Sequence, residues 1–135
     1  MRKEGVKLKN FTSEKENLKL KIKAVNEYFE LNSFVDLIRD CKILRVQNLF
    51  SEMEQWLFDL LKKEGLEVVN GILAVIYFDI NNKEYALIYA EEAKIKFPGV
   101  PIWDAIIYHS EEKQDYPDDL ETRWEALLAE IYGSM

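Results

Sequence analysis

Few side chains in this sequence combine the residue types and the spacing that catalysis requires. His109 is the only histidine and Cys41 the only cysteine among 135 residues, so a zinc site of these ligand types has at most two donors, far apart in the chain. A nucleophilic Cys–His pair needs Cys41 exposed beside the imidazole, whereas the helical spacing of its apolar neighbours places it on a buried face. We therefore expect no catalytic residue, no metal site and no cofactor, and a protein that is not an enzyme.

Phosphate chemistry is also disfavoured. A loop that holds the phosphates of a nucleotide needs several glycines within a few residues of one another. The five glycines of this chain are instead scattered, at Gly5, Gly65, Gly71, Gly99 and Gly133. The sequence therefore predicts neither a phosphate-binding loop nor a dinucleotide-binding motif.

Carboxylates, by contrast, gather between residues 104 and 130, where nine acidic side chains stand against two basic ones. Adjacent carboxylates on a helix point about 100° apart, which suits neither a shared metal nor an acid–base pair. Aromatic rings lie among them, and rings that anchor beside charges that steer are typical of an interface for a basic protein. The predicted partner-binding residues are Asp104, Tyr108, Glu111, Glu112, Asp115, Tyr116, Asp118, Asp119, Glu121 and Glu125. A solvated acidic surface, with the rings in the core, is the alternative.

The net charge is unevenly distributed along the chain. It is −7 in total, but residues 1–24 carry eight basic and three acidic side chains, a balance of +5, which leaves −12 for residues 25–135. An acidic body repels a phosphate backbone, so we expect no nucleic acid to bind its main surface, although a basic arm could touch one. The charges do not determine the oligomeric state.

Length and composition fit a single globular domain over residues 1–135, with 48% hydrophobic residues to form its core. Residues 1–12 form a basic leader, for which we expect partial disorder. The longest apolar runs fall well short of the roughly 18 residues that a membrane span needs, and no signal-peptide pattern follows the charged N-terminus. We expect no membrane partner and a reducing, cytoplasmic location, where a lone cysteine is ordinary.

Helical periodicity dominates the first half of the chain. Ser13 and Glu16 match a capping box, which predicts that a first helix follows. Residues 18–23 also alternate strictly, so an early strand paired with residues 6–9 is an alternative. The buried stripes of three predicted helices are Leu18, Ile22, Val25 and Phe29, then Phe34, Leu37, Ile38 and Cys41, then Phe50, Met53, Leu57, Leu60 and Leu61. Gly65 follows the third stripe as a C-cap.

Residues 66–98 decide the fold, and two interpretations are open. β-branched and aromatic residues on both sides of Asn81 and Asn82 are typical of a β-hairpin over residues 72–90. Alanines at helical spacing favour a helical pair instead. We favour a mainly α fold, a single-domain helical bundle with a possible helix-turn-helix repeat. The alternative is an α+β fold with this central hairpin.

Two further helices complete the predicted bundle. One covers residues 102–112, with Trp103, Ile106 and Ile107 facing inward. The last begins at Asp118 and Asp119, whose carboxylates suit the positive end of a helix. Its buried stripe consists of Trp124, Leu127, Leu128 and Ile131.

The helical pair resembles a tetratricopeptide repeat, a unit of about 34 residues. The matching positions of a unit that starts near Glu67 are Leu73, Ala74, Tyr77, Ala86, Ala90, Ala93 and Pro98. Asn70 and Asn81 depart from the pattern, because the family usually has tryptophan and glycine there. The resemblance covers one repeat and implies an adaptor or chaperone that holds a peptide segment of a partner.

In size, acidity and lack of catalytic apparatus the whole chain is similar to the immunity proteins of bacterial toxin systems. No family motif carries this resemblance, so it transfers no site residue. It implies a bacterial cytoplasmic inhibitor that neutralises a basic, nuclease-type toxin by direct binding. The repeat-type adaptor is the alternative function.

Overall fold

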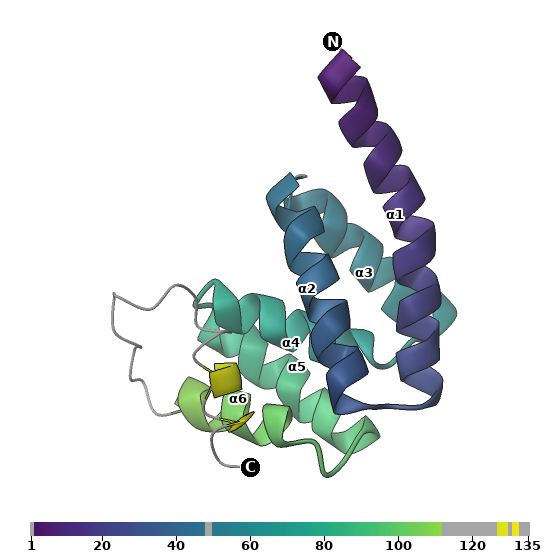
Figure 1. Cartoon of the computed structure of the whole chain (residues 1–135). Coiled ribbons are helices and arrows are strands. Elements are labelled where there is room, and N and C mark those ends of the chain that lie inside the picture. Colours follow the sequence, from purple (N-terminus) through teal and green to yellow (C-terminus); the bar gives the residue numbers. More distant parts are fainter. Residues whose placement is uncertain (1, 48–49, 112–126, 130, 133–135) are drawn as a thin grey trace. The chain divides into compact units, whose positions relative to one another are not determined.

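The computed structural model describes residues 2–47, 50–111, 127–129 and 131–132. Every regular element in this part of the chain is an α-helix (Figure 1). The predicted mainly α helical bundle is therefore confirmed. The strand alternatives are wrong, because residues 18–23 and most of residues 72–90 are helical.

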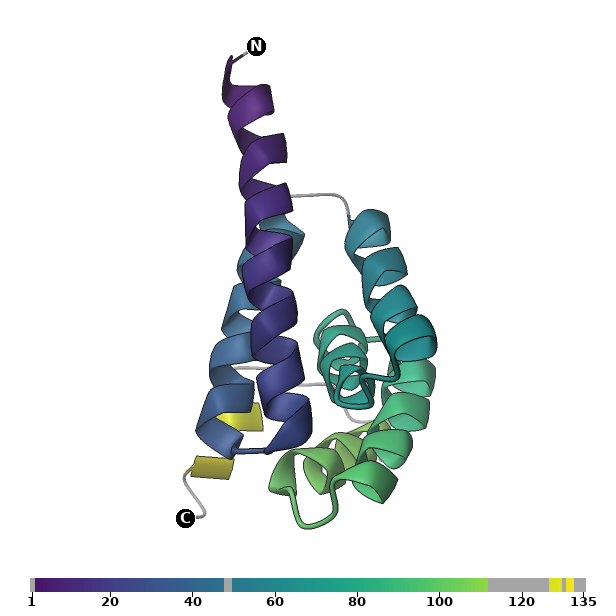
Figure 2. The ribbon, with the colours of Figure 1, turned by 90° about the vertical axis from the view of Figure 1, so that its right-hand side faces the viewer.

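The chain divides into an N-terminal unit, residues 1–69, and a C-terminal unit, residues 70–135. The N-terminal unit contains α1 (Arg2–Glu27), α2 (Leu31–Gln47) and α3 (Phe50–Glu64). The helices α1 and α2 form an antiparallel hairpin, and α3 packs against α2. The N-terminal end of α1 extends beyond both other helices (Figure 2).

The predicted apolar stripes form the core of the N-terminal unit. Among the side chains with less than a tenth of their surface exposed are Leu18, Ile22, Val25, Phe34, Leu37, Ile38, Cys41, Met53, Leu57 and Leu60. Cys41 is 1% exposed, as its spacing predicts. The start of α1 differs from the prediction, since the helix begins at Arg2 rather than after Ser13. Arginine, lysine, glutamate and leucine make up six of the eleven residues from 2 to 12 and are good helix formers, and the segment contains no proline.

A contact distant in sequence connects the last turn of α1 to the segment that follows α3. The Asn26 side-chain oxygen accepts a hydrogen bond from the Val68 backbone N–H at 2.9 Å. Gly65 adopts a positive φ of 66°, and the Leu66 N–H reaches back to the Leu60 carbonyl at 3.2 Å. This is the glycine-terminated helix end that the sequence predicts.

The C-terminal unit contains α4 (Val69–Asp79), which begins at its boundary, α5 (Lys83–Lys96) and α6 (Pro101–Glu111). All residues from Asn70 to Phe78 are buried, and Asn70 is the one polar residue among them, so α4 is apolar around nearly its whole circumference. Such a helix has the same unbroken apolar run as a buried strand, and periodicity does not separate the two. This is why the hairpin remained open at the level of sequence.

Two asparagines separate α4 from α5. Asn81 takes the left-handed conformation, with φ of 64°, and ends α4. The Asn82 side chain then accepts a hydrogen bond from the Tyr85 backbone N–H at 3.3 Å and caps α5. Asparagine tolerates the left-handed conformation, which is why a pair of asparagines suggests a hairpin turn. In this protein the same property allows a turn between two helices. The alanines of α5, Ala86, Ala90 and Ala93, share one buried face.

A large ring fixes α6. The Trp103 side chain is fully buried, and its ring N–H donates to the Phe97 carbonyl oxygen at 3.0 Å. The ring lies so close to Gly71 that a Cβ atom there would be 2.3 Å from Cη2 of Trp103. Glycine at this position of α4 is therefore what admits the ring.

The final predicted stripe is partly described. Leu127, Leu128 and Ile131 are buried, as expected. The predicted start of this helix at residues 118–119 and Trp124 lie outside the described residues. No helix in the described part of the chain is long and apolar enough to cross a membrane.

Candidate partner-binding site

Three of the ten predicted partner-binding residues fall within the described structure, namely Asp104, Tyr108 and Glu111 on α6. The other seven lie outside the described residues, and they are Glu112, Asp115, Tyr116, Asp118, Asp119, Glu121 and Glu125. The geometry of the site is therefore the geometry of α6.

The helix α6 has one buried and one exposed face. Its buried residues are Ile102, Trp103, Ile106 and Ser110. Asp104, Tyr108 and Glu111 follow one another at i, i+4 and i+7, which places them on a single face, and all three are exposed. Tyr108 has 57% of its surface exposed. The structure thus brings the three described residues together as an aromatic ring between two carboxylates. We call this set the α6 face.

An ion pair connects one end of the α6 face to α5. The Lys94 ammonium lies 2.7 Å from Asp104 Oδ1, and both side chains are largely exposed. The hydrogen bond to Asp104, followed by the charge of that carboxylate, raises the pKa of Lys94 above its ordinary value of 10.5. Part of the Asp104 charge is therefore compensated, so Glu111 contributes most to the electrostatic attraction of this face.

Aromatic contacts position the ring of Tyr108. It meets the His109 imidazole edge to face, with centroids 5.1 Å apart. The imidazole also lies near the Phe78 ring of α4, at 6.4 Å. The lone histidine thus packs among rings next to the α6 face. Among the described residues, no three His, Cys, Asp or Glu side chains come together as they would around a metal ion.

A second exposed apolar surface, which sequence reasoning missed, lies on α5. The large side chains of Tyr85, Ile88 and Ile95 are 48%, 52% and 69% exposed. Ile88 and Ile95 lie opposite the buried alanines, and Tyr85 lies to one side of them. Exposed carboxylates flank these side chains, namely Glu84, Glu91 and Glu92. We call these six residues the α5 outer face. The available signal was the position of Ile88 and Ile95 opposite the alanine stripe.

Tyr77 lies in the core of the C-terminal unit. It is buried, stacks on Tyr89 with centroids 5.8 Å apart and meets Tyr85 edge-on at 5.2 Å. This cluster holds α4 against α5. A peptide bound by this helical pair would therefore contact the outer residues of α5 in preference to Tyr77.

No protein-family model matches the sequence, and comparisons with curated proteins and with solved structures found no match either. What the chain binds is therefore inferred from the chemistry of its own surface.

Proposed function

We propose that this protein is a non-enzymatic, protein-binding protein that uses the α6 face and the acidic segment after it to capture a basic protein partner. The exposure of Tyr108 between Asp104 and Glu111 is the observation that supports this proposal. An exposed tyrosine offers a rigid apolar anchor, and neighbouring carboxylates accelerate the encounter with a cationic surface.

The most specific form of this proposal is an immunity-type inhibitor in the bacterial cytoplasm. A nuclease toxin holds nucleic acid with cationic side chains, and a surface rich in carboxylates competes for the same charges. The charge of −12 over residues 25–135 supports such a role. Inhibition by direct binding needs no catalytic group in the inhibitor.

Affinity capture from the native host, followed by mass spectrometry, tests the proposal. The bait is the full chain, compared with the double variant Tyr108→Ala/Glu111→Lys. Glu52→Lys on α3 is the matched control, because it reverses one exposed charge outside both the α6 face and the α5 outer face. We expect a basic protein that the wild type and the control retain and the double variant loses.

Binding kinetics with that captured partner provide the second measurement. The association rate should fall several-fold as salt rises from low to physiological ionic strength, since exposed charges are screened over about 8–10 Å in this range. An association rate that neither salt nor the double variant changes would contradict the proposal.

The α5 outer face supports a second candidate function, the adaptor that binds a peptide segment of a partner. Three exposed apolar side chains flanked by glutamates suit an amphipathic, basic peptide helix. Screening a peptide library against wild type and Ile88→Ser/Ile95→Ser tests it. Peptides that bind the wild type and not this variant support the adaptor, and failure to bind any peptide opposes it.

A further inference from the structure

A groove of about 470 Å³ lies within the N-terminal unit, between the last two turns of α1 and the first turns of α2. Its volume falls in the range of small-molecule sites, roughly 300–1,000 Å³. The side chains that line it differ in character along its length. They indicate both the shape and the charge of a ligand.

The floor of the groove is apolar. Val25 and Leu37 are almost fully buried, and Ala24 lies beside them with an exposed methyl group. They lie on the facing sides of the α1–α2 hairpin, at the spacing that keeps each helix's contribution on one face. A short run of methylene groups packs on such a floor without burying a polar atom.

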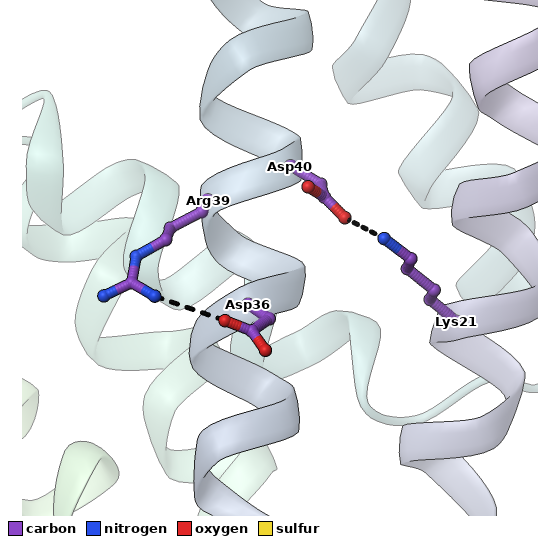
Figure 3. A network of polar contacts seen from close by, with 4 residues as sticks. All are labelled: Lys21, Asp36, Arg39 and Asp40. Carbon is purple, nitrogen blue, oxygen red and sulfur yellow. Dashed lines mark hydrogen bonds and ion pairs between the residues drawn. The ribbon is translucent and has the colours of Figure 1, made fainter.

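Two ion pairs compensate the charges at the far end of the groove and on its α2 wall. The Lys21 ammonium on α1 donates to Asp40 on α2 at 2.5 Å, which bridges the two helices (Figure 3). One turn away, Asp36 accepts from the Arg39 guanidinium at 3.2 Å (Figure 3). The only lysine of the lining is thus already engaged with a carboxylate, which makes the groove a poor site for an anion.

The negative charge that remains belongs to Glu30, at the end where α1 and α2 connect. Its carboxylate accepts a long hydrogen bond, 3.4 Å, from the neutral Ser33 hydroxyl. Tyr28, two residues before Glu30 in the chain, also lines the groove, and its surface is 76% exposed. A carboxylate next to an aromatic ring is a combination that attracts organic cations, by charge-assisted hydrogen bonding and by the ring's electron-rich face.

We propose that this groove binds an alkylguanidinium or alkylammonium group. The methylene chain lies over Ala24, Val25 and Leu37, and the cationic end lies between the Glu30 carboxylate and the Tyr28 ring. A free amine and the side chain of an arginine or lysine present the same chemistry. The groove belongs to the N-terminal unit, so this proposal is independent of the α6 face.

Nuclear magnetic resonance titration of the full chain with n-butylguanidinium tests the proposal. The matched probe is n-butylurea, which has nearly the same shape and no charge. We expect saturable shifts of the Ala24, Val25 and Leu37 amide signals with the cation, and affinity for the urea about tenfold lower, as the loss of one charge-assisted hydrogen bond predicts. Equal affinity for the two probes, or no saturable shift with the cation, would overturn the proposal.

Variants test whether Glu30 and Tyr28 bind the cationic end of the ligand. Glu30→Gln should weaken binding of butylguanidinium about tenfold, because it removes the charged acceptor. Glu27→Gln is the control, since Glu27 is exposed, carries the same charge and does not line the groove. Tyr28→Ala should weaken binding a few-fold, while Tyr28→Phe keeps the ring and the affinity. An equal effect of the Glu27 and Glu30 variants, or no effect of Tyr28→Ala, would contradict the proposal.

Two peptides distinguish the sources of the cation. Acetylated Gly-Gly-Arg-Gly-Gly amide presents the arginine side chain, and the same peptide with citrulline replaces its charge by a neutral urea. Tighter binding of the arginine peptide than of butylguanidinium identifies a protein segment as the source, and weaker binding identifies a free amine. Equal affinity for the citrulline and arginine peptides would overturn the proposal, because the positive charge would then make no difference to binding.

Discussion

The two units of this chain are both helical, but they are packed in different ways. In the N-terminal unit, α1 and α2 bury side chains of similar size, such as Ile22 and Leu37, and cross-helix ion pairs such as Lys21–Asp40 add to this seam. In the C-terminal unit, α4 and α5 bury glycine and alanine, and α6 inserts the ring of Trp103 against Gly71. We therefore expect the stability of the C-terminal unit to depend more on one contact, that of Trp103 with Gly71, than the stability of the N-terminal unit depends on any single side chain.

This difference predicts unequal sensitivity to substitution. A seam of medium-sized side chains loses one contact among many when a single residue changes. A large ring seated against glycine leaves either a large void or a steric clash when either partner changes. The α6 face depends on this contact, because Trp103 precedes Asp104 and the same helix carries Tyr108.

Replacing the ring should have the largest effect. We expect Trp103→Ala to lower the free energy of unfolding by about 3–5 kcal/mol, through lost burial and the cavity that remains. Denaturant unfolding measures the total, and amide hydrogen exchange shows where protection is lost. The loss should be concentrated in residues 70–111, and an equal loss over residues 15–42 would refute the proposed concentration of stability.

Filling the space next to the ring should have the second largest effect. Gly71→Ala places a Cβ atom 2.3 Å from the ring, and overpacking of this kind costs about 1–3 kcal/mol. In a Trp103→Phe background the clash is removed, and alanine then stabilises α4 by up to about 1 kcal/mol through its helix propensity. A change of sign between the two backgrounds would support the contact. The same cost in both would show that the ring is not responsible.

How far the sequence predicts this molecule also differs between the units. In the N-terminal unit the amphipathic stripes, and even the burial of Cys41, follow from spacing alone, because each helix there has one apolar face. In the C-terminal unit α4 is apolar on nearly all sides, so its run from Val69 to Phe78 is compatible with a strand or a helix. What decides is tertiary, namely the close approach of the Trp103 ring to Gly71, which a sequence pattern does not encode.

The candidate sites show the same limit. The shared exposure of Asp104, Tyr108 and Glu111 could be predicted, because i, i+4 and i+7 positions share a helix face whatever the fold. The exposure of Ile88 and Ile95 is a weaker prediction, because an apolar residue on a helix is more often core and only the position opposite the alanine stripe indicates otherwise. The groove of the N-terminal unit is lined by residues of α1, of α2 and of the connection between them. These residues come together only when the hairpin forms, so the pattern of either helix alone does not predict the groove.

The turn between α4 and α5 should show an intermediate effect. Asn82→Ala removes the side-chain oxygen that accepts from the Tyr85 N–H, and loss of such a cap costs about 1 kcal/mol. Asn82→Asp keeps an acceptor at the same position and should cost much less. Thermal unfolding of the two variants measures the difference. Equal destabilisation would show that the cap is not what stabilises the start of α5.

The smallest effects should come from the exposed ion pairs, one in each unit. Lys19 with Glu64, at 2.8 Å, and Lys94 with Asp104, at 2.7 Å, both hold a lysine whose pKa is raised, chiefly by the hydrogen bond to its carboxylate partner. A raised pKa in the folded state means that the pair's stabilisation is complete below the ordinary value of 10.5 and is lost as pH rises through the folded-state pKa.

Titration of the lysine side-chain signals by nuclear magnetic resonance checks both pairs. Asp104→Asn should return the pKa of Lys94 towards 10.5 and leave Lys19 unchanged, and Glu64→Gln should do the converse. Stability at neutral pH should change little in either variant, because exposed pairs of this kind contribute little. If Asp104→Asn instead destabilised the C-terminal unit as much as Gly71→Ala, the ion pair would share the role that we assign to Trp103. The contrast between a distributed and a concentrated core would then fail.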